Sequence, residues 1–86
     1  MISVEKHRLF LKCYKKLSKK QQELFNVRLK MFCVDPRNPA LRVHRLTGSL
    51  SNFYSFSVGG DLRAHFQWVA KNHVILYKIG THNQVY

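Results

Sequence analysis

The stretch "NFYSFSVGGDLRAHFQW", residues 52–68, decides the fold. Apolar and polar residues alternate on both sides of Gly59–Asp61, which predicts two antiparallel strands joined by a turn. Side chains of a strand point alternately to the two faces of a sheet, so paired residues must share a face. A loop of three residues, Gly59–Asp61, meets this condition and predicts these pairs: Val58 with Leu62, Phe56 with Ala64, and Tyr54 with Phe66.

The same register places the polar residues of the hairpin on the opposite face. It predicts Ser57 beside Arg63, Ser55 beside His65, and Phe53 beside Gln67. We therefore expect a polar, cationic platform on the sheet face turned away from the helices. The segment "HVILYKI", residues 73–79, is apolar on both faces and predicts a central strand.

The first half of the chain has helical periodicity. Residues 1–4 predict an edge strand, and residues 5–17 a helix that buries Phe10, Cys13, Tyr14 and Leu17. Ser18 and Gln21 form a capping-box pattern that begins a second helix, which Asp35-Pro36 ends. We expect its inward residues to be Leu24, Val27, Met31 and Val34. Residues 1–86 are long enough for one α+β domain.

The charge of the chain is strongly positive. Fifteen Lys and Arg residues oppose four Asp and Glu residues, a formal net charge of +11. Such a protein repels its own copies and attracts polyanions, so we expect a monomer that binds nucleic acid before an acidic protein or an anionic membrane. Residues 1–30 hold no signal-like or membrane-spanning segment, and Cys13 and Cys33 fit buried free thiols. We expect a cytoplasmic protein that does not bind membranes.

Chemically active side chains follow the last predicted strand. The turn-out at Gly80 is expected to deliver His82 and Tyr86 to the end of the sheet near Arg63. An imidazole, a phenol and a guanidinium suit cleavage of RNA by its own 2′-hydroxyl. That reaction needs a base, an acid and a cation beside the phosphate.

Metal-dependent nuclease chemistry fits the sequence poorly. Such enzymes hold their cations with clustered carboxylates, whereas the four acidic residues are scattered over predicted helices and turns: Glu5, Glu23, Asp35 and Asp61. The Cys and His residues lack zinc-ligand spacing. We expect neither a metal nor another cofactor.

The segment "LRVHRLTGSLSNFYSFSVGGDLRAHFQW" (41–68), followed by "LYKIGTHNQVY" (76–86), resembles the RelE/ParE toxin superfamily. Within it, the chain is most similar to YafQ-like and RelE-like messenger-RNA interferases. The resemblance implies a small antiparallel sheet with an N-terminal two-helix hairpin on one face, in the order β-α-α-β-β-β. It also implies a toxin of a type II toxin–antitoxin system, which cleaves messenger RNA in the ribosomal A site without metal and is blocked by an acidic antitoxin.

The resemblance also assigns roles to individual residues. Its catalytic positions match His44, Asp61, Arg63, His82 and Tyr86. Contacts to messenger RNA or 16S ribosomal RNA are expected at Arg63, Lys78, His65, Arg45, Lys15 and Lys16. Ser57 departs from the YafQ-like pattern, which has a histidine there. The role of general base must then pass to His82 or His44, with His65 as a further substitute.

Two other functions stay open at this point. ParE-like relatives share the fold and poison DNA gyrase by binding it, although they generally lack the histidine and tyrosine at the tail. Ser57 also leaves room for a catalytically weak module that only binds RNA or antitoxin. The segment "GTHNQVY" favours the nuclease.

Overall fold

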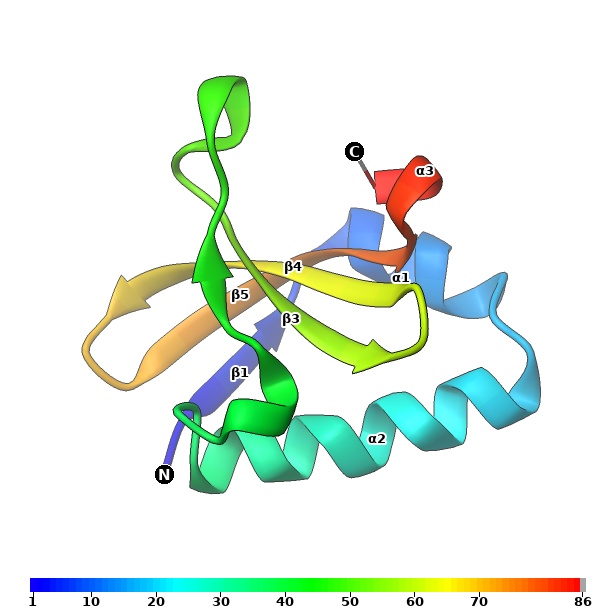
Figure 1. Ribbon diagram of the computed structural model, residues 1–86, viewed down its shortest axis with the longest axis horizontal. Coiled ribbons are helices and arrows are strands. Elements are labelled where there is room, and N and C mark those ends of the chain that lie inside the picture. Colours follow the sequence, from blue (N-terminus) through cyan, green and yellow to red (C-terminus); the bar gives the residue numbers. More distant parts are fainter. Residues whose placement is uncertain (86) are drawn as a thin grey trace.

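The structure of the protein, a computed structural model, describes residues 1–85. The predicted roles of Tyr86 therefore lie outside the described residues. The fold is a five-stranded sheet in the order β1-β5-β4-β3-β2, flanked by helices (Figure 1). Its strands are β1 (Ser3–Lys6), β2 (His44–Arg45), β3 (Tyr54–Gly59), β4 (Leu62–Ala70) and β5 (His73–Thr81). The predicted α+β class is confirmed.

The sheet is mixed, which corrects the expectation of an antiparallel sheet. β1 pairs parallel with β5, whereas the other neighbouring strands are antiparallel. A parallel partner requires a long crossover, and everything between β1 and β5 in the chain supplies it. The sequence does not indicate the short strand β2, because two residues are too few to show an alternating pattern.

The two main helices are α1 (Arg8–Lys15) and α2 (Lys19–Val34). The predicted capping box at Ser18 and Gln21 is present, and Asp35 follows the last residue of α2. α1 begins later than expected because residues 5–6 belong to β1 and His7 caps the helix, its Nδ1 accepting from the Leu9 N–H. β1 pairs with β5 only as far as Leu76, and α1 then contacts β5.

The buried face of α2 differs from the predicted one. Phe25 and Phe32 are fully buried, whereas Val27 is 60% exposed and Val34 is 71% exposed. Leu24, also expected inside, is exposed, while Met31 is partly buried against the core. The aromatic rings, spaced seven residues apart on one helix face, bury more apolar area than the valines do.

The core is built around Phe32. Its ring centroid lies 5.0 Å from Phe56 on β3 and 5.0 Å from Phe66 on β4, and 6.0 Å from Trp68. Such ring pairs stabilise the fold beyond the burial of their apolar area, because the face of one ring attracts the edge of the other. The cluster fixes α2 across one face of the sheet (Figure 1).

The β3–β4 hairpin has the predicted faces. The structure confirms the pairs Tyr54–Phe66, Ser55–His65, Phe56–Ala64 and Ser57–Arg63. The predicted Val58–Leu62 pair is wrong, because Gly59 lies opposite Leu62 and a bulge absorbs the extra residue. Gly59 and Gly60 have φ values of 147° and 54°, which other residues rarely adopt. The bulge keeps the alternation of faces that a three-residue loop would have given.

Three short helices complete the fold: η1 (Pro39–Leu41), η2 (Gly48–Leu50) and α3 (His82–Val85). Residues 44–53, called the arm below, contain β2 and η2 and rise from the sheet beside α3 (Figure 1). Among residues 1–85, the helices are all too short or too polar to span a membrane.

The revised face of α2 can be tested by stability. Phe32→Ala should lower the free energy of unfolding by about 3–5 kcal/mol, because it leaves a cavity between α2 and the sheet. Val27→Ala should change it by less than about 0.5 kcal/mol, because Val27 faces solvent. Urea denaturation measures both values. A larger loss for Val27→Ala than for Phe32→Ala would contradict this packing.

Candidate active site

The tail helix α3 is tied to the β3–β4 turn. His82 is the first residue of α3, and its N–H donates to Oδ2 of Asp61 at 3.4 Å. Asp61 therefore lies beside His82 and contacts its backbone. A carboxylate at this position satisfies a donor that the first turn of a helix leaves unpaired.

Gly80 has a different role from the predicted one. The chain does not turn out of the sheet at Gly80, because β5 continues to Thr81 and Gly80 pairs with Arg63. A Cβ at Gly80 would lie 2.8 Å from Oε1 of Gln84 and 3.1 Å from its Cβ. Gly80 thus leaves room for α3 to fold back against the end of β5.

Gln84 holds this fold-back and was missed in the sequence analysis. Its Oε1 accepts from the Thr81 N–H at 2.8 Å. Thr81 followed three residues later by Gln84 is a capping-box pattern, the same signal that located the start of α2. The spacing Thr81-x-x-Gln84 could have predicted a helix at the tail.

The arm and α3 together border an open cavity of about 240 Å³. It is lined by His44, Arg45, Leu46, Thr47, Leu50 and His82. His44 and Arg45 come from β2, at the far edge of the sheet from β1, yet the structure brings them to the same cavity as His82. Three of the predicted functional residues therefore meet here.

Backbone carbonyls orient both β2 side chains. Nδ1 of His44 lies 2.9 Å from the Arg42 carbonyl oxygen, and Nε of Arg45 donates to the Ser51 carbonyl at 2.7 Å. A carbonyl only accepts, so this contact requires the hydrogen of His44 on Nδ1 and leaves the basic lone pair on Nε2. The arrangement selects the tautomer of neutral His44 that can act as a base through Nε2.

His65 lies under the arm, not on an open platform. Its side chain points to the predicted face, but only 2% of the residue is exposed, and its strand partner Ser55 is fully buried. The pKa of His65 is lowered from 6.5 to about 4, first by burial and then by the charges of Lys78, His44, Arg63 and His82. The expected open surface is thus covered, and His65 is neutral at physiological pH.

Two further residues that were predicted to contact RNA, Lys78 and Arg63, lie near His65 on the sheet. Lys78 pairs with His65 in the β4–β5 ladder and lines a cavity of about 110 Å³ with it, together with Leu50 and Phe53 of the arm. Arg63 is half-buried two residues before His65 on β4, between Ser57 and Gly80. Because His44, Arg63, Lys78 and His82 all act on His65, we call these four residues with Arg45 the basic cluster.

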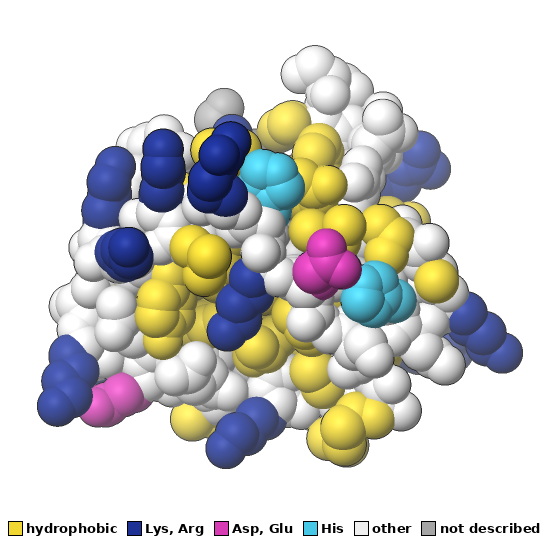
Figure 2. Space-filling view, turned by 180° about the vertical axis from the view of Figure 1, so that it is seen from behind, with side chains coloured by type: hydrophobic (Ala, Val, Ile, Leu, Met, Phe, Trp, Pro, Cys, Tyr) yellow, Lys and Arg dark blue, Asp and Glu magenta, His cyan; other side chains and the backbone are white. Residues whose placement is uncertain are grey.

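The predicted contacts on α1 lie elsewhere. Lys16 lines a separate cavity of about 350 Å³ with Gln84 and Thr81, and Lys15 is exposed in the last turn of α1. Basic side chains also spread over the α1 side of the molecule, where acidic ones are few (Figure 2). Lys15 and Lys16 are therefore part of the wider basic surface, and neither lines the cavity of His44 and His82.

The acidic residues occupy four different places. Glu5 pairs with His73 at 3.2 Å, Asp61 contacts His82, Asp35 accepts from the Arg37 N–H, and Glu23 is exposed on α2. Among residues 1–85, no three His, Cys, Asp or Glu residues gather closely enough to hold a metal ion.

Burial of neutral His65 makes stability depend on pH. The unfolded chain binds a proton at this histidine below about pH 6.5, whereas the folded chain does so only near pH 4. The contribution of His65 to the free energy of unfolding is therefore fully present above pH 6.5. It is lost as the pH drops toward 4, and this loss is at most about 3 kcal/mol. His65→Gln should flatten the fall between these two pH values, measured by urea denaturation.

The matched control is Lys19→Gln, which removes one exposed charge at the start of α2. This variant should keep the wild-type slope of stability against pH. An unchanged slope in His65→Gln would show that His65 does not titrate as its burial requires.

No protein-family model matches the sequence, and no curated protein shows significant similarity to it. Solved structures do match. YafQ from Escherichia coli BL21(DE3) has a TM-score of 0.78 at 16% identity, covering 100% of this chain and 99% of YafQ. A metal-bound toxin from Helicobacter pylori has a TM-score of 0.71 at 24% identity, covering 100% of both chains.

A third match is the YoeB–YefM toxin–antitoxin complex from Staphylococcus aureus. Its TM-score is 0.73 at 19% identity, covering 95% of this chain and 98% of the matched chain. The likeness extends over nearly whole chains, so it concerns the complete arrangement of helices and sheet. The chain therefore has the fold of the RelE/ParE-like toxins, among them YafQ and YoeB.

Proposed function

We propose that the protein is the toxin of a type II toxin–antitoxin system and a metal-independent endoribonuclease that cleaves messenger RNA, at the ribosomal A site. The observation that carries the proposal is the shared cavity of His44, Arg45 and His82 within the basic cluster. Two imidazoles and several cations beside one cavity can supply a base, an acid and charge stabilisation for phosphate.

In this mechanism His44 is the general base. Its Nε2 takes the proton of the RNA 2′-hydroxyl, because Nδ1 is held at the Arg42 carbonyl. The 2′-oxygen then attacks the adjacent phosphorus, and the bond from phosphorus to the 5′-oxygen breaks. The products are a 2′,3′-cyclic phosphate and a free 5′-hydroxyl.

His82 is the general acid, and two arginines stabilise the phosphate. The His82 imidazolium gives its proton to the departing 5′-oxygen. Arg63 and Arg45 stabilise the charge that develops on the phosphate oxygens. The contact of Arg45 with Ser51 uses only its Nε, so its terminal nitrogens remain for phosphate.

Three residues support this site. Asp61 holds the start of α3, and therefore His82, in place. His65, neutral and buried, supports the surrounding residues from beneath and does not touch RNA. Tyr86 is proposed to close the site by stacking on a base or by assisting proton transfer.

The partners follow from charge and from the fold. A net charge of +11 suits messenger RNA, 16S ribosomal RNA and an acidic antitoxin, and the matched YoeB forms a complex with its antitoxin YefM. We propose that an acidic antitoxin covers the basic cluster and competes with RNA. Without it the protein is a monomer, and its site of action is the cytoplasm, where translated messages are found.

Cleavage by the variants tests the mechanism. His44→Ala, His82→Ala and Arg63→Ala should each slow cleavage of a translated message about 10²–10⁴-fold, because each removes an acid–base group or a phosphate contact. Primer extension on a message translated with and without the protein measures the rate.

Lys19→Ala provides the control for these variants. Lys19 is exposed at the start of α2, and its replacement should preserve the rate. Melting temperatures should stay close to that of the wild type in all four variants. Wild-type rates in both His44→Ala and His82→Ala would refute the mechanism.

Binding of single-stranded RNA should weaken steeply with salt. Each phosphate neutralised releases condensed counterions and contributes about 0.7 to the slope of log K against log salt concentration. Fluorescence anisotropy of a labelled RNA, measured between low and physiological ionic strength, gives this slope. An affinity that does not change with salt would exclude RNA phosphates as the main ligand.

A further inference from the structure

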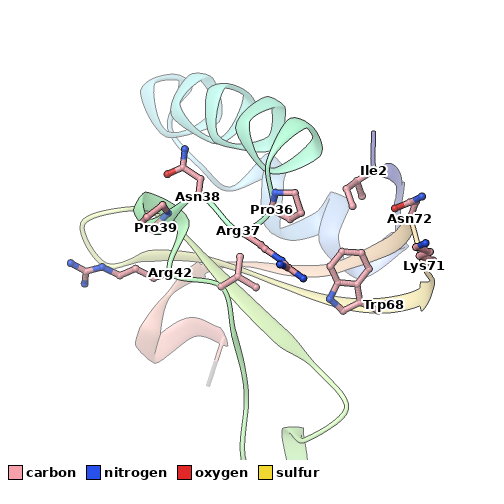
Figure 3. A pocket seen from close by; sticks show the side chains of 10 residues that line it. Ile2, Pro36, Arg37, Asn38, Pro39, Arg42, Trp68, Lys71 and Asn72 are labelled. Atoms are coloured by element: carbon pink, nitrogen blue, oxygen red, sulfur yellow. The ribbon is translucent and has the colours of Figure 1, made fainter.

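A second basic cavity lies at the other end of the sheet from α3. It has a volume of about 600 Å³ and opens where the turn between β4 and β5, the N-terminus and the loop after α2 meet (Figure 3). Its cationic and aromatic lining residues are Arg37, Arg42, Trp68 and Lys71, with Pro36 and Val43 as apolar walls. The proposed catalytic mechanism uses none of these side chains, although the backbone carbonyl of Arg42 orients His44.

The chemistry of this cavity is cationic and aromatic. Arg37, Arg42 and Lys71 are exposed, and the lining contains no carboxylate. The indole of Trp68 packs on Phe32 and Phe66 but is only partly buried, so part of it faces the cavity. Arg37 points toward Trp68, whereas the side chain of Arg42 extends away from both (Figure 3).

Hydrogen bonds fix the cavity walls in place. The Ile2 N–H donates to the Cys33 carbonyl at 3.0 Å, and the Ser3 N–H donates to the Asn72 carbonyl at 2.8 Å. Arg28 of α2 donates to the Ala40 carbonyl at 3.1 Å, which holds η1 against the helix. Because these walls are already ordered, binding a ligand costs less conformational entropy.

Arg42 connects this cavity with the candidate active site. It has a φ of 48°, the one positive value at a non-glycine residue within residues 1–85. Its carbonyl contacts the ring of His44, which lines the cavity beneath α3, while its own side chain lines the second cavity. Because Arg42 lies only two residues before His44, the first residue of the edge strand β2, one extended ligand can contact both.

We propose that this second cavity binds a nucleotide of single-stranded RNA, whose base stacks on Trp68 and whose flanking phosphates contact Arg37, Arg42 and Lys71. The choice of RNA rests on the proposed function. An RNA strand in the active site would cross the edge at β2 and continue into this cavity. An acidic peptide would use the cations but would gain little from the indole face, whereas every base can stack on it.

The protein provides its own reporter, because Trp68 is the single tryptophan of the chain. The full-length His82→Ala variant, which prevents cleavage under the proposed mechanism, is titrated with a hexaadenylate RNA. Quenching of Trp68 fluorescence is expected on binding. Inorganic phosphate and a hexaglutamate peptide are titrated in parallel and should quench much less.

Variants then separate the two parts of the cavity. In the same background, Arg37→Gln should weaken quenching-detected RNA affinity about 5- to 50-fold, whereas Lys19→Gln, which removes one exposed charge from α2, should change it less than about twofold. Trp68→Leu should lower the affinity for labelled RNA about 5- to 150-fold, the usual effect of losing one stacked base. The melting temperature of each variant shows that it is folded.

The outcomes distinguish this inference from the proposed function. Binding without Trp68 quenching, or equal effects of Arg37→Gln and Lys19→Gln, would overturn the inference even if the wild type cleaves RNA. Stronger quenching by the acidic peptide than by RNA would overturn it in favour of a protein partner. Specific quenching by RNA would uphold it, even if the wild type cleaves no message.

Discussion

The packing of Phe32 against the two central strands constrains the rest of the molecule. Its ring contacts Phe56 on β3 and Phe66 on β4, and both of those side chains are fully buried. Because side chains alternate along a strand, burying Phe66 toward α2 turns Arg63 and His65 to the other face. A slip of one residue would bury a guanidinium beneath α2, so the core that stabilises the fold also places the cations of the candidate site.

Repulsion among the many positive charges lowers the stability of the folded chain, and the few acidic residues do not offset it. Asp61 and Asp35 bind backbone N–H groups, and Glu5 pairs with His73, so these three carboxylates stabilise turns and the sheet edge. The basic cluster is left with its mutual repulsion, and the neutral state of His65 relieves part of it. An acidic partner that binds only the folded chain would remove more of this repulsion and stabilise the fold by mass action.

Local signals in the sequence predicted much of this structure. The hairpin register followed from alternation, and the start of α2 followed from its capping box, because each depends on neighbouring residues. The parallel pairing of β1, the burial of His65 under the arm and the inward face of α2 depend on contacts between distant segments. The helical period alone could not show whether Val27 or Phe25 faces the sheet, because that depends on the shape of the space between α2 and the sheet.

The same distinction explains the candidate site. Arg63 and Asp61 were placed correctly relative to the sheet because they flank a turn whose geometry is local. His44 could be matched from the sequence only by resemblance, since nothing near it in the chain shows that the arm meets α3. Ser57 lies opposite Arg63 on the half-buried strand face, where a histidine would be held by the sheet itself. With serine there, the proposed mechanism takes its base from the edge strand β2, and the Arg42 carbonyl sets the tautomer of that base. In the proposed mechanism, the backbone of Arg42 therefore orients the base while its side chain reaches the second cavity, which joins catalysis and RNA positioning in one residue.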